Sequence, residues 1–223
     1  MKKALTTLAI AGLSFAAFAQ GTVSWTGVAN LLIVQTNSSV YFGGGSTGSG
    51  TTGATVGSSV SLYYFELLTS ASSSTAPGSI SALSSWADTG LEAQNGAASN
   101  GRILQLNAST ATVANNWPAN STQNLILVGW SANLGTTWSA ALNILNAGTW
   151  GANSYFGVTS SVGSLASATG NPGVVVFGTG PGQINNPAAN PLSLNLLAPT
   201  PEPGTMALAA VGGLSLLAFR RKK

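Results

Sequence analysis

Between residues 20 and 198 the apolar residues of this 223-residue chain come in short runs separated by Gly, Ser, Asn and Pro. The runs are rich in Val, Ile, Leu, Tyr and Trp, and short runs of this kind bounded by turn residues are typical of strands. They predict an all-β body, an antiparallel β-sandwich of two sheets, with a β-helix as the alternative. The predicted strands lie within residues 22–36, 60–68, 123–130, 155–162, 174–178 and 192–197.

Two stretches of the body have helical spacing instead. Apolar residues recur at a helical interval over residues 80–87 and again over residues 138–145, where Gly148 is a natural stop. We therefore expect one or two short helices beside the strands. Residues 43–57 consist almost entirely of Gly, Ser and Thr, which predicts a flexible loop.

Charge is scarce, at 5% of all residues against ~25% in an ordinary globular chain. Apart from the two ends, Arg102 is the only basic residue, and one arginine cannot form a phosphate-binding surface, so we exclude nucleic acid as a partner. The chain has no Cys and no His. This composition excludes disulfides, thiol nucleophiles and His-based catalysis, and we expect neither a metal nor another cofactor.

The N-terminus has the pattern of a secretory signal peptide. Two lysines precede an apolar stretch, and Ala17 and Ala19 form the small-residue exit that signal peptidase requires. Cleavage is expected before Gln20, which makes residues 1–19 a signal helix and places the mature chain outside the cytoplasm.

The C-terminus has the pattern of a second membrane signal. Residues 199–204 are too rich in proline to be helical. Residues 205–219 are predominantly apolar and are predicted to form a transmembrane helix, shorter than the ~20 residues that usually span a bilayer. A basic cluster after such a segment is a stop-transfer arrangement that keeps the end of the chain in the cytoplasm. The basic cluster is Arg220, Arg221, Lys222 and Lys223.

Pro201, Glu202 and Pro203, followed by the apolar segment and the basic end, resemble the PEP-CTERM sorting signal of Gram-negative bacteria over residues 199–223. The resemblance implies that an exosortase reads the tripeptide and releases or transfers the protein. The chain is then a substrate that passes through an inner-membrane intermediate to the cell surface or extracellular matrix. Residues 20–198 form the body, which resembles more weakly the uncharacterised bodies of small PEP-CTERM proteins from verrucomicrobial-type bacteria, through segments such as 129–138 and 153–156.

We therefore expect a non-catalytic protein of the cell surface or matrix. Two alternatives to this function each rest on a few residues. Glu66 with Asp88 or Glu92 could form the carboxylate pair of a glycoside hydrolase, although Thr89 and Gly90 indicate a turn between the last two acids.

The other alternative is a carbohydrate-binding module. Trp117 and Trp150 lie in turn-like sequences, next to Pro and Gly, and are the tryptophans expected to be exposed and able to stack on an extracellular polysaccharide. We expect the other tryptophans to belong to the core.

Overall fold

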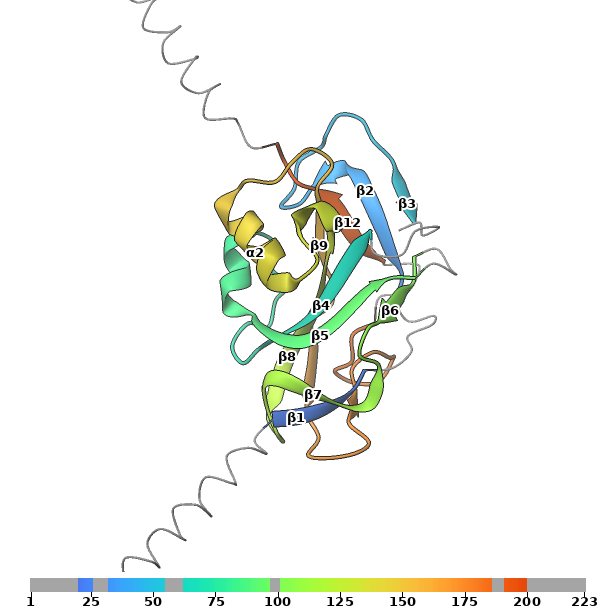
Figure 1. Ribbon diagram of the computed structural model, residues 1–223, viewed down its shortest axis with the longest axis vertical. Coiled ribbons are helices and arrows are strands. Elements are labelled where there is room, and N and C mark those ends of the chain that lie inside the picture. Colours follow the sequence, from blue (N-terminus) through green and yellow to red (C-terminus); the bar gives the residue numbers. More distant parts are fainter. Residues whose placement is uncertain (1–19, 26–31, 55–61, 97–100, 186–190, 200–223) are drawn as a thin grey trace, which may run out of the picture.

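The computed structural model describes residues 20–25, 32–54, 62–96, 101–185 and 191–199 (Figure 1). Within these ranges the chain is mostly β, with one short α-helix, so the all-β fold class is confirmed. The helices are the 3-10 helices η2 (Ser81–Ser85) and η3 (Ala132–Leu134) and the α-helix α2 (Trp138–Ala147). The strands are β1 (Gln20–Trp25), β2 (Val34–Tyr41), β3 (Thr52–Ala54), β4 (Tyr63–Ser70), β5 (Ala87–Asn95), β6 (Ile103–Gln105), β7 (Ser109–Pro118), β8 (Thr122–Ser131), β9 (Tyr155–Val158), β10 (Gly163–Ala166), β11 (Val174–Val175) and β12 (Leu192–Leu196).

The strands form a large sheet and a small one. The large sheet has the order β3-β2-β12-β9-β8-β4-β5-β6. Strand β9 pairs with the second half of β8, and β10 pairs with the first half of β8. The small sheet has the order β11-β1-β7. The apolar run 123–130 lies in β8, whose residues from Leu125 to Ser131 are all buried, because a strand covered on both faces needs apolar residues at every position.

The prediction of a purely antiparallel sandwich is wrong in two respects. First, β12 is parallel to β2, and β1 is parallel to β11. These pairs join segments far apart in the chain, so no hairpin forces them to be antiparallel. Second, the large sheet is curled, and its two faces are covered differently, by the small sheet on one side and by helices on the other.

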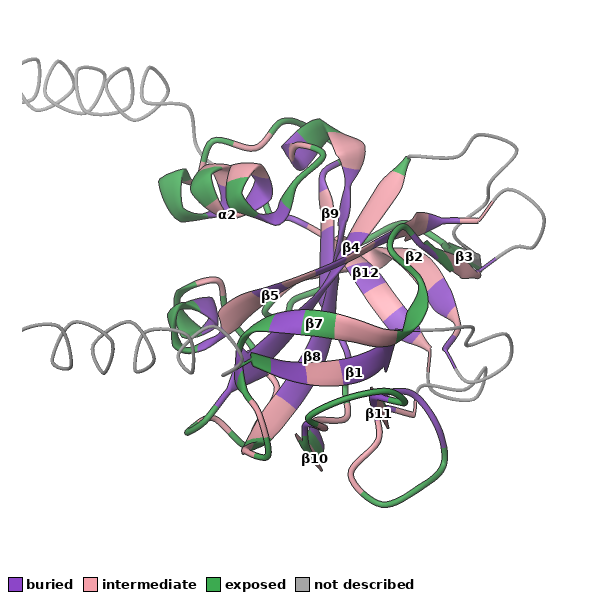
Figure 2. Cartoon of the chain, turned by 60° about the horizontal axis from the view of Figure 1, so that its bottom comes forward, coloured by how far each residue is buried: buried purple, intermediate pink, exposed green. Residues whose placement is uncertain are grey.

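The first core lies between the two sheets. Trp25 and Trp117 from the small sheet are fully buried with Phe65, Leu127 and Leu194 from the large sheet. The members from β4 and β8 alternate along each strand, as expected where one face of a strand meets a second sheet. Figure 2 shows buried residues along these central strands and exposed residues in the outer loops.

The second core lies on the opposite face of the large sheet, under the helices. Trp138, Ala141 and Leu145 form the buried side of α2. The indole ring of Trp138 lies 5.6 Å from that of Trp130 and 6.4 Å from the ring of Phe156, measured between ring centroids. Helix α2 confirms the helix predicted over residues 138–145.

The ends of α2 follow from local chemistry. Thr137 caps the N-terminus by accepting a hydrogen bond from the backbone N–H of Ala140 at 3.4 Å. Gly148 ends the helix in the left-handed conformation, with φ of 65°, which a residue with a side chain rarely adopts. The other predicted helix, over residues 80–87, is reduced to η2, and Ala87 already belongs to β5.

The acids Asp88 and Glu92 lie on one strand, β5, so the predicted turn at Thr89-Gly90 is wrong. A β-bulge at this point accommodates the glycine, which has a φ of 70°. The bulge also brings β5 against β7 of the small sheet: the Asn116 side chain donates to the carbonyl of Asp88 at 2.7 Å. The large sheet therefore curls toward the small sheet at β5.

Other predicted segments differ in detail. The apolar stretch 22–36 contains β1 and the beginning of β2, with residues 26–31 outside the described ranges. Within the predicted loop 43–57, Thr52–Ala54 forms the edge strand β3. It pairs with β2, and Ser38 and Thr51 add two hydrogen bonds between the segments, at 2.9 and 3.1 Å.

The predicted signal helix (residues 1–19) and membrane helix (residues 205–219) lie outside the described residues. None of the helices within the described ranges has the length and apolar character needed to cross a bilayer.

Candidate functional site

The structure brings together the three acids of the body that the hydrolase hypothesis names. Glu66 on β4 lies directly opposite Glu92 on β5, and Asp88 lies opposite Leu68, two residues further along β4. Glu66 has no exposed surface. Within the described part of the chain its carboxyl oxygens make no short hydrogen bond, but the Asp88 carboxyl and the backbone of Leu91 lie near enough to interact with them.

Burial raises the pKa of Glu66 to about 10, and the hydrogen-bonding interaction of its carboxyl group with Asp88 and the negative charges of Asp88 and Glu92 add to the increase. The Glu66 carboxyl group is therefore protonated and neutral at pH 7. A glycosidase needs both carboxyl groups to reach its substrate, whereas Glu66 is fully buried on β4, a strand that lies between β5 and β8. This geometry disfavours a catalytic pair. Among the residues described, no cluster of three or more His, Cys, Asp or Glu is arranged to hold a metal ion.

Trp117 is fully buried, so the expectation that it is exposed is wrong. Its indole N–H donates to the carbonyl of Ser121 at 2.9 Å, and its ring belongs to the core between the sheets. The asparagines before Trp117 and the proline after it are residues typical of turns, and Asn116 does adopt a φ of 57°. Asn116 nevertheless belongs to strand β7, at an irregularity in the pairing of β7 with β1. Trp117 is therefore unavailable for stacking on a sugar.

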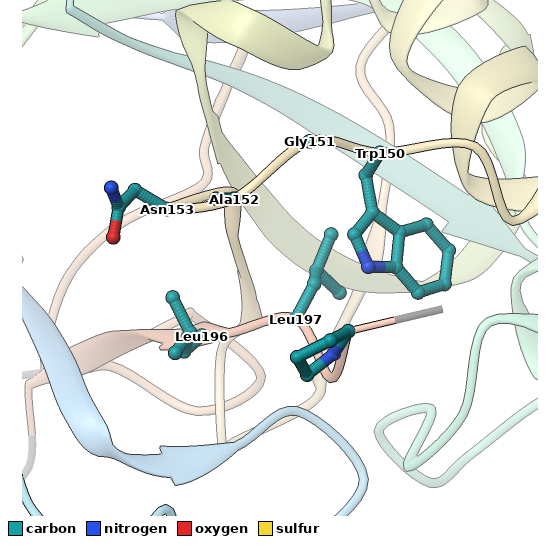
Figure 3. Close-up of a pocket in the computed structure, with 7 residues that line it drawn as sticks. Trp150, Gly151, Ala152, Asn153, Leu196 and Leu197 are labelled. Atoms are coloured by element: carbon teal, nitrogen blue, oxygen red, sulfur yellow. The ribbon is translucent and has the colours of Figure 1, made fainter. Parts of the chain in front are cut away.

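Trp150 is half-buried and lies beside a pocket of about 360 Å³ at the end of β12 (Figure 3). Its indole N–H donates to the carbonyl of Ala198 at 2.8 Å. In Figure 3 the side chain of Asn153 is directed away from Trp150. We call this hollow the exit pocket, and among the described residues none that lines it is charged. The lining residues are Trp150, Gly151, Ala152, Asn153, Leu196, Leu197 and Pro199.

The chain is held to the body up to the edge of this pocket. Strand β12 lies inside the large sheet, between β2 and β9. Beyond its end, the Leu197 N–H donates to the carbonyl of Ser154 at 2.8 Å, and the Leu197 side chain is only 5% exposed. With the bond from Trp150 to Ala198, these contacts fix the point at which the chain leaves the body.

Side-chain hydrogen bonds hold the loop that carries the opposite wall of the exit pocket. Asn133 donates to the Ser154 hydroxyl at 2.9 Å, and that hydroxyl donates to the carbonyl of Gly151 at 2.8 Å. The Ser131 hydroxyl accepts from the backbone N–H of Tyr155 at 2.8 Å. Partly buried polar contacts therefore fix this wall of the pocket.

Gln20, the expected first residue of the mature chain, is the first residue of β1 and is exposed. It pairs with Pro118 of β7. Ala17 and Ala19, the other residues of the expected cleavage site, lie outside the described residues. So do Pro201, Glu202 and Pro203 and the basic residues 220–223.

Comparison with known proteins identifies the C-terminal segment. Residues 199–222 match the PEP-CTERM protein-sorting motif. The match supports an exported, cell-surface-directed protein and implies processing by an exosortase. No curated protein and no solved structure matches the chain.

The sequence interpretation missed the residues that shape the exit pocket, chiefly Ser154, Leu197 and Ala198. Ser154 and Ala198 act through a hydroxyl or a backbone carbonyl, groups whose partners become visible only when strands distant in sequence are brought together. For Leu197 and Ala198 the one available signal is position, because these two residues directly precede Pro199, the first residue of the matched motif.

Proposed function

We propose that this chain is a non-catalytic protein of the cell surface or extracellular matrix, which an exosortase processes at Pro201-Glu202-Pro203. The observation that carries the proposal is the sorting motif at residues 199–222. It begins directly after Ala198, the last residue of the body that Trp150 holds in place. The chain is in this account the substrate of the sorting reaction.

The proposed route has three steps. Signal peptidase removes residues 1–19 during export, which leaves Gln20 as the first residue. Residues 205–219 then retain the protein in the inner membrane, with the basic end at residues 220–223 on the cytoplasmic side. Processing at the Pro-Glu-Pro tripeptide releases the body to the outer surface.

The chemistry of the body supports an existence in a matrix. Its surface is covered mainly by uncharged polar residues, since the body carries only Arg102, Asp88 and Glu92 beside the neutral Glu66. A surface with so little net charge gives weak colloidal repulsion and favours association with other neutral surfaces.

Substitution of the tripeptide tests the proposal. We expect Glu202→Gln, in a host with its exosortase, to leave the precursor full-length and in the inner membrane. Glu92→Gln removes one negative charge from the body and is the matched control, which we expect to be processed normally. Normal processing of the Glu202→Gln variant and of a variant with all three residues changed to Ala would refute the proposal.

Binding of a neutral saccharide is a second candidate function, and the exit pocket is the observation that favours it. The pocket combines a half-buried indole with the exposed side chain of Asn153, and its lining within the described ranges is uncharged. Neutral sugars present apolar faces and hydroxyl groups, which such a surface can contact.

Tryptophan fluorescence can report on this candidate because the other five tryptophans are at most 7% exposed. If the pocket binds an extracellular polysaccharide, titration should change the emission, and Trp150→Phe should abolish the change. An unchanged emission at high polysaccharide concentration would remove this candidate.

The carboxylate hydrolase is the least favoured candidate, because Glu66 is enclosed and neutral. If a hydrolytic activity is found, Glu66→Gln, Asp88→Asn and Glu92→Gln should each be assayed. Full activity in all three variants would exclude these acids as its source.

A further inference from the structure

The distance between the body and the sorting tripeptide is short. Only Pro199 and Thr200 separate the anchored Ala198 from Pro201. Because an extended chain spans at most ~3.6 Å per residue, Pro203 stays within roughly 18 Å of Ala198. A folded domain of 100 residues already has a radius of gyration of about 13 Å. An enzyme with its active site at the tripeptide therefore has to come close to the body.

The anchor that limits this distance is firm. Releasing it by several residues would require β12 to leave both β2 and β9 and to expose Leu192 and Leu194, which are fully buried. Leu197 and Ala198 add the hydrogen bonds to Ser154 and from Trp150. The body consequently presents one fixed surface, the exit pocket and its rim, beside the sorting signal.

We propose that the exit pocket and its rim form the surface of the body that contacts the processing exosortase, so that the enzyme recognises this face as well as the tripeptide. This inference rests on the proposed function. The part of the pocket lining that the structure describes carries no charge, while Gly151, Ala152 and Asn153 form an exposed rim. The partner surface that fits it is uncharged and partly apolar, and a buried charge in the contact would be costly.

The test adds one charge to the rim and, in a second set of variants, lengthens the chain between the body and the tripeptide. Ala152→Glu adds a carboxylate at an exposed position. Ala108→Glu makes the same change at an exposed position just before β7, a strand that Figure 1 shows at the opposite end of the body from β9 and α2. Each variant is made in the full chain, with and without ten Gly and Ser residues inserted between Ala198 and Pro199. An insert of this length adds about 16–19 Å of mean reach. Conversion of the precursor is followed over time in cells that contain the exosortase.

We expect Ala152→Glu to slow conversion at least about tenfold with the native spacing, and less than about twofold with the insert. Ala108→Glu should process at the unsubstituted rate in both forms. Resistance of the body to protease in the same cells checks that each variant is folded.

Unchanged processing of Ala152→Glu with the native spacing would overturn the inference, as would a defect of equal size with the insert. The proposed function fails separately, if the unsubstituted chain is never processed or if the variant with three Ala residues at the tripeptide is processed normally. Either of these two results would refute both the proposed function and this inference.

Discussion

Glu66 is the residue whose chemistry departs most from its ordinary state. It is a carboxyl group without exposed surface, opposite Glu92 and near Asp88, in a chain with very few charges. Like charges directly opposite each other destabilise a strand pair, and protonation of Glu66 removes that repulsion. The folded protein therefore holds a proton that the unfolded chain releases above the ordinary pKa of a glutamic acid.

This difference gives a pH dependence with a definite sign. The folded-state pKa of about 10 lies above the ordinary glutamic acid pKa of 4.5, so the stabilising contribution is complete below about pH 4.5 and is lost as the pH rises toward about 10. Between pH 5 and 7 we expect the free energy of unfolding to fall on the order of 3 kcal/mol. Urea unfolding at several pH values measures the change.

Glu66→Gln should remove most of this slope, because the amide cannot ionise, whereas Glu92→Gln should retain most of it. A slope that is the same in the Glu66→Gln variant and in the unsubstituted protein would show that Glu66 is not the group responsible.

The hydrogen bond from the Trp150 indole to the carbonyl of Ala198 can also be tested. Trp150→Phe keeps an aromatic ring in the exit pocket but removes the N–H that holds Ala198. A typical hydrogen bond contributes about 0.5–1.5 kcal/mol, so we expect the backbone N–H of Leu197 to exchange with solvent roughly 2–12 times faster. Asn153→Ala, a change at an exposed position of the same loop, is the control. Equal exchange in all three proteins would contradict the proposed anchoring role of the indole.

At the scale of elements, the pairing of β9 with β12 depends on a close backbone approach at Gly157. A Cβ atom at this residue would lie 2.1 Å from the carbonyl oxygen of Ser193, closer than any real contact. Gly157→Ala should therefore destabilise the protein by about 1–3 kcal/mol. A Cβ at Gly53 on the edge strand β3 meets nothing within 4 Å.

Gly53→Ala is accordingly the matched control, and we expect it to change stability by less than about 0.5 kcal/mol. Chemical unfolding of both variants gives the comparison. Equal stabilities would mean that β9 and β12 are not packed as described.

Elements with a strong apolar signal could be predicted from the sequence, and elements defined by long-range pairing could not. The apolar run in β8 and the helix ending at Gly148 were both predictable from local pattern. Strands β5 and β7 were missed, because β5 contains a glycine at a bulge and β7 contains two consecutive asparagines, both of which indicate turns locally. Their strand conformation depends on partners that the local sequence does not reveal.

The same distinction holds for the candidate sites. The acids could be named from composition alone, but the burial of Glu66 depends on β5 and β8 packing on either side of β4. The sequence predicts that Trp117 and Trp150 are exposed and that the other tryptophans are buried. Trp150 is half-buried, more exposed than the others, whereas Trp117 is fully buried because its turn-like neighbours belong to an irregular strand.

At the level of the whole molecule, the C-terminal strand β12 is an internal part of the fold, and the sorting motif begins at Pro199, shortly after this strand ends. A chain that ends at Pro203 keeps every described contact of the body, so we expect its stability to be within about 0.5 kcal/mol of the full chain. A chain that ends at Pro191 loses β12, with Leu192 and Leu194 from the core.

We expect the shorter chain to lose its cooperative unfolding transition, since each buried leucine contributes about 1.5–3 kcal/mol and a native domain is stable by only about 5–15 kcal/mol. Urea unfolding of both truncated proteins is the measurement. A cooperative transition in the shorter chain would contradict the central position of β12.

In the proposed route the body is exported and then separated from its membrane signal at the Pro-Glu-Pro tripeptide. The intact mass and the location of the native protein, recovered from the organism that makes it, test this claim. We expect a species that begins at Gln20, ends near Pro203 and is found outside the inner membrane. A protein that retains residues 220–223 and stays in the inner membrane would contradict the claim, and its C-terminal segment would then be an ordinary anchor.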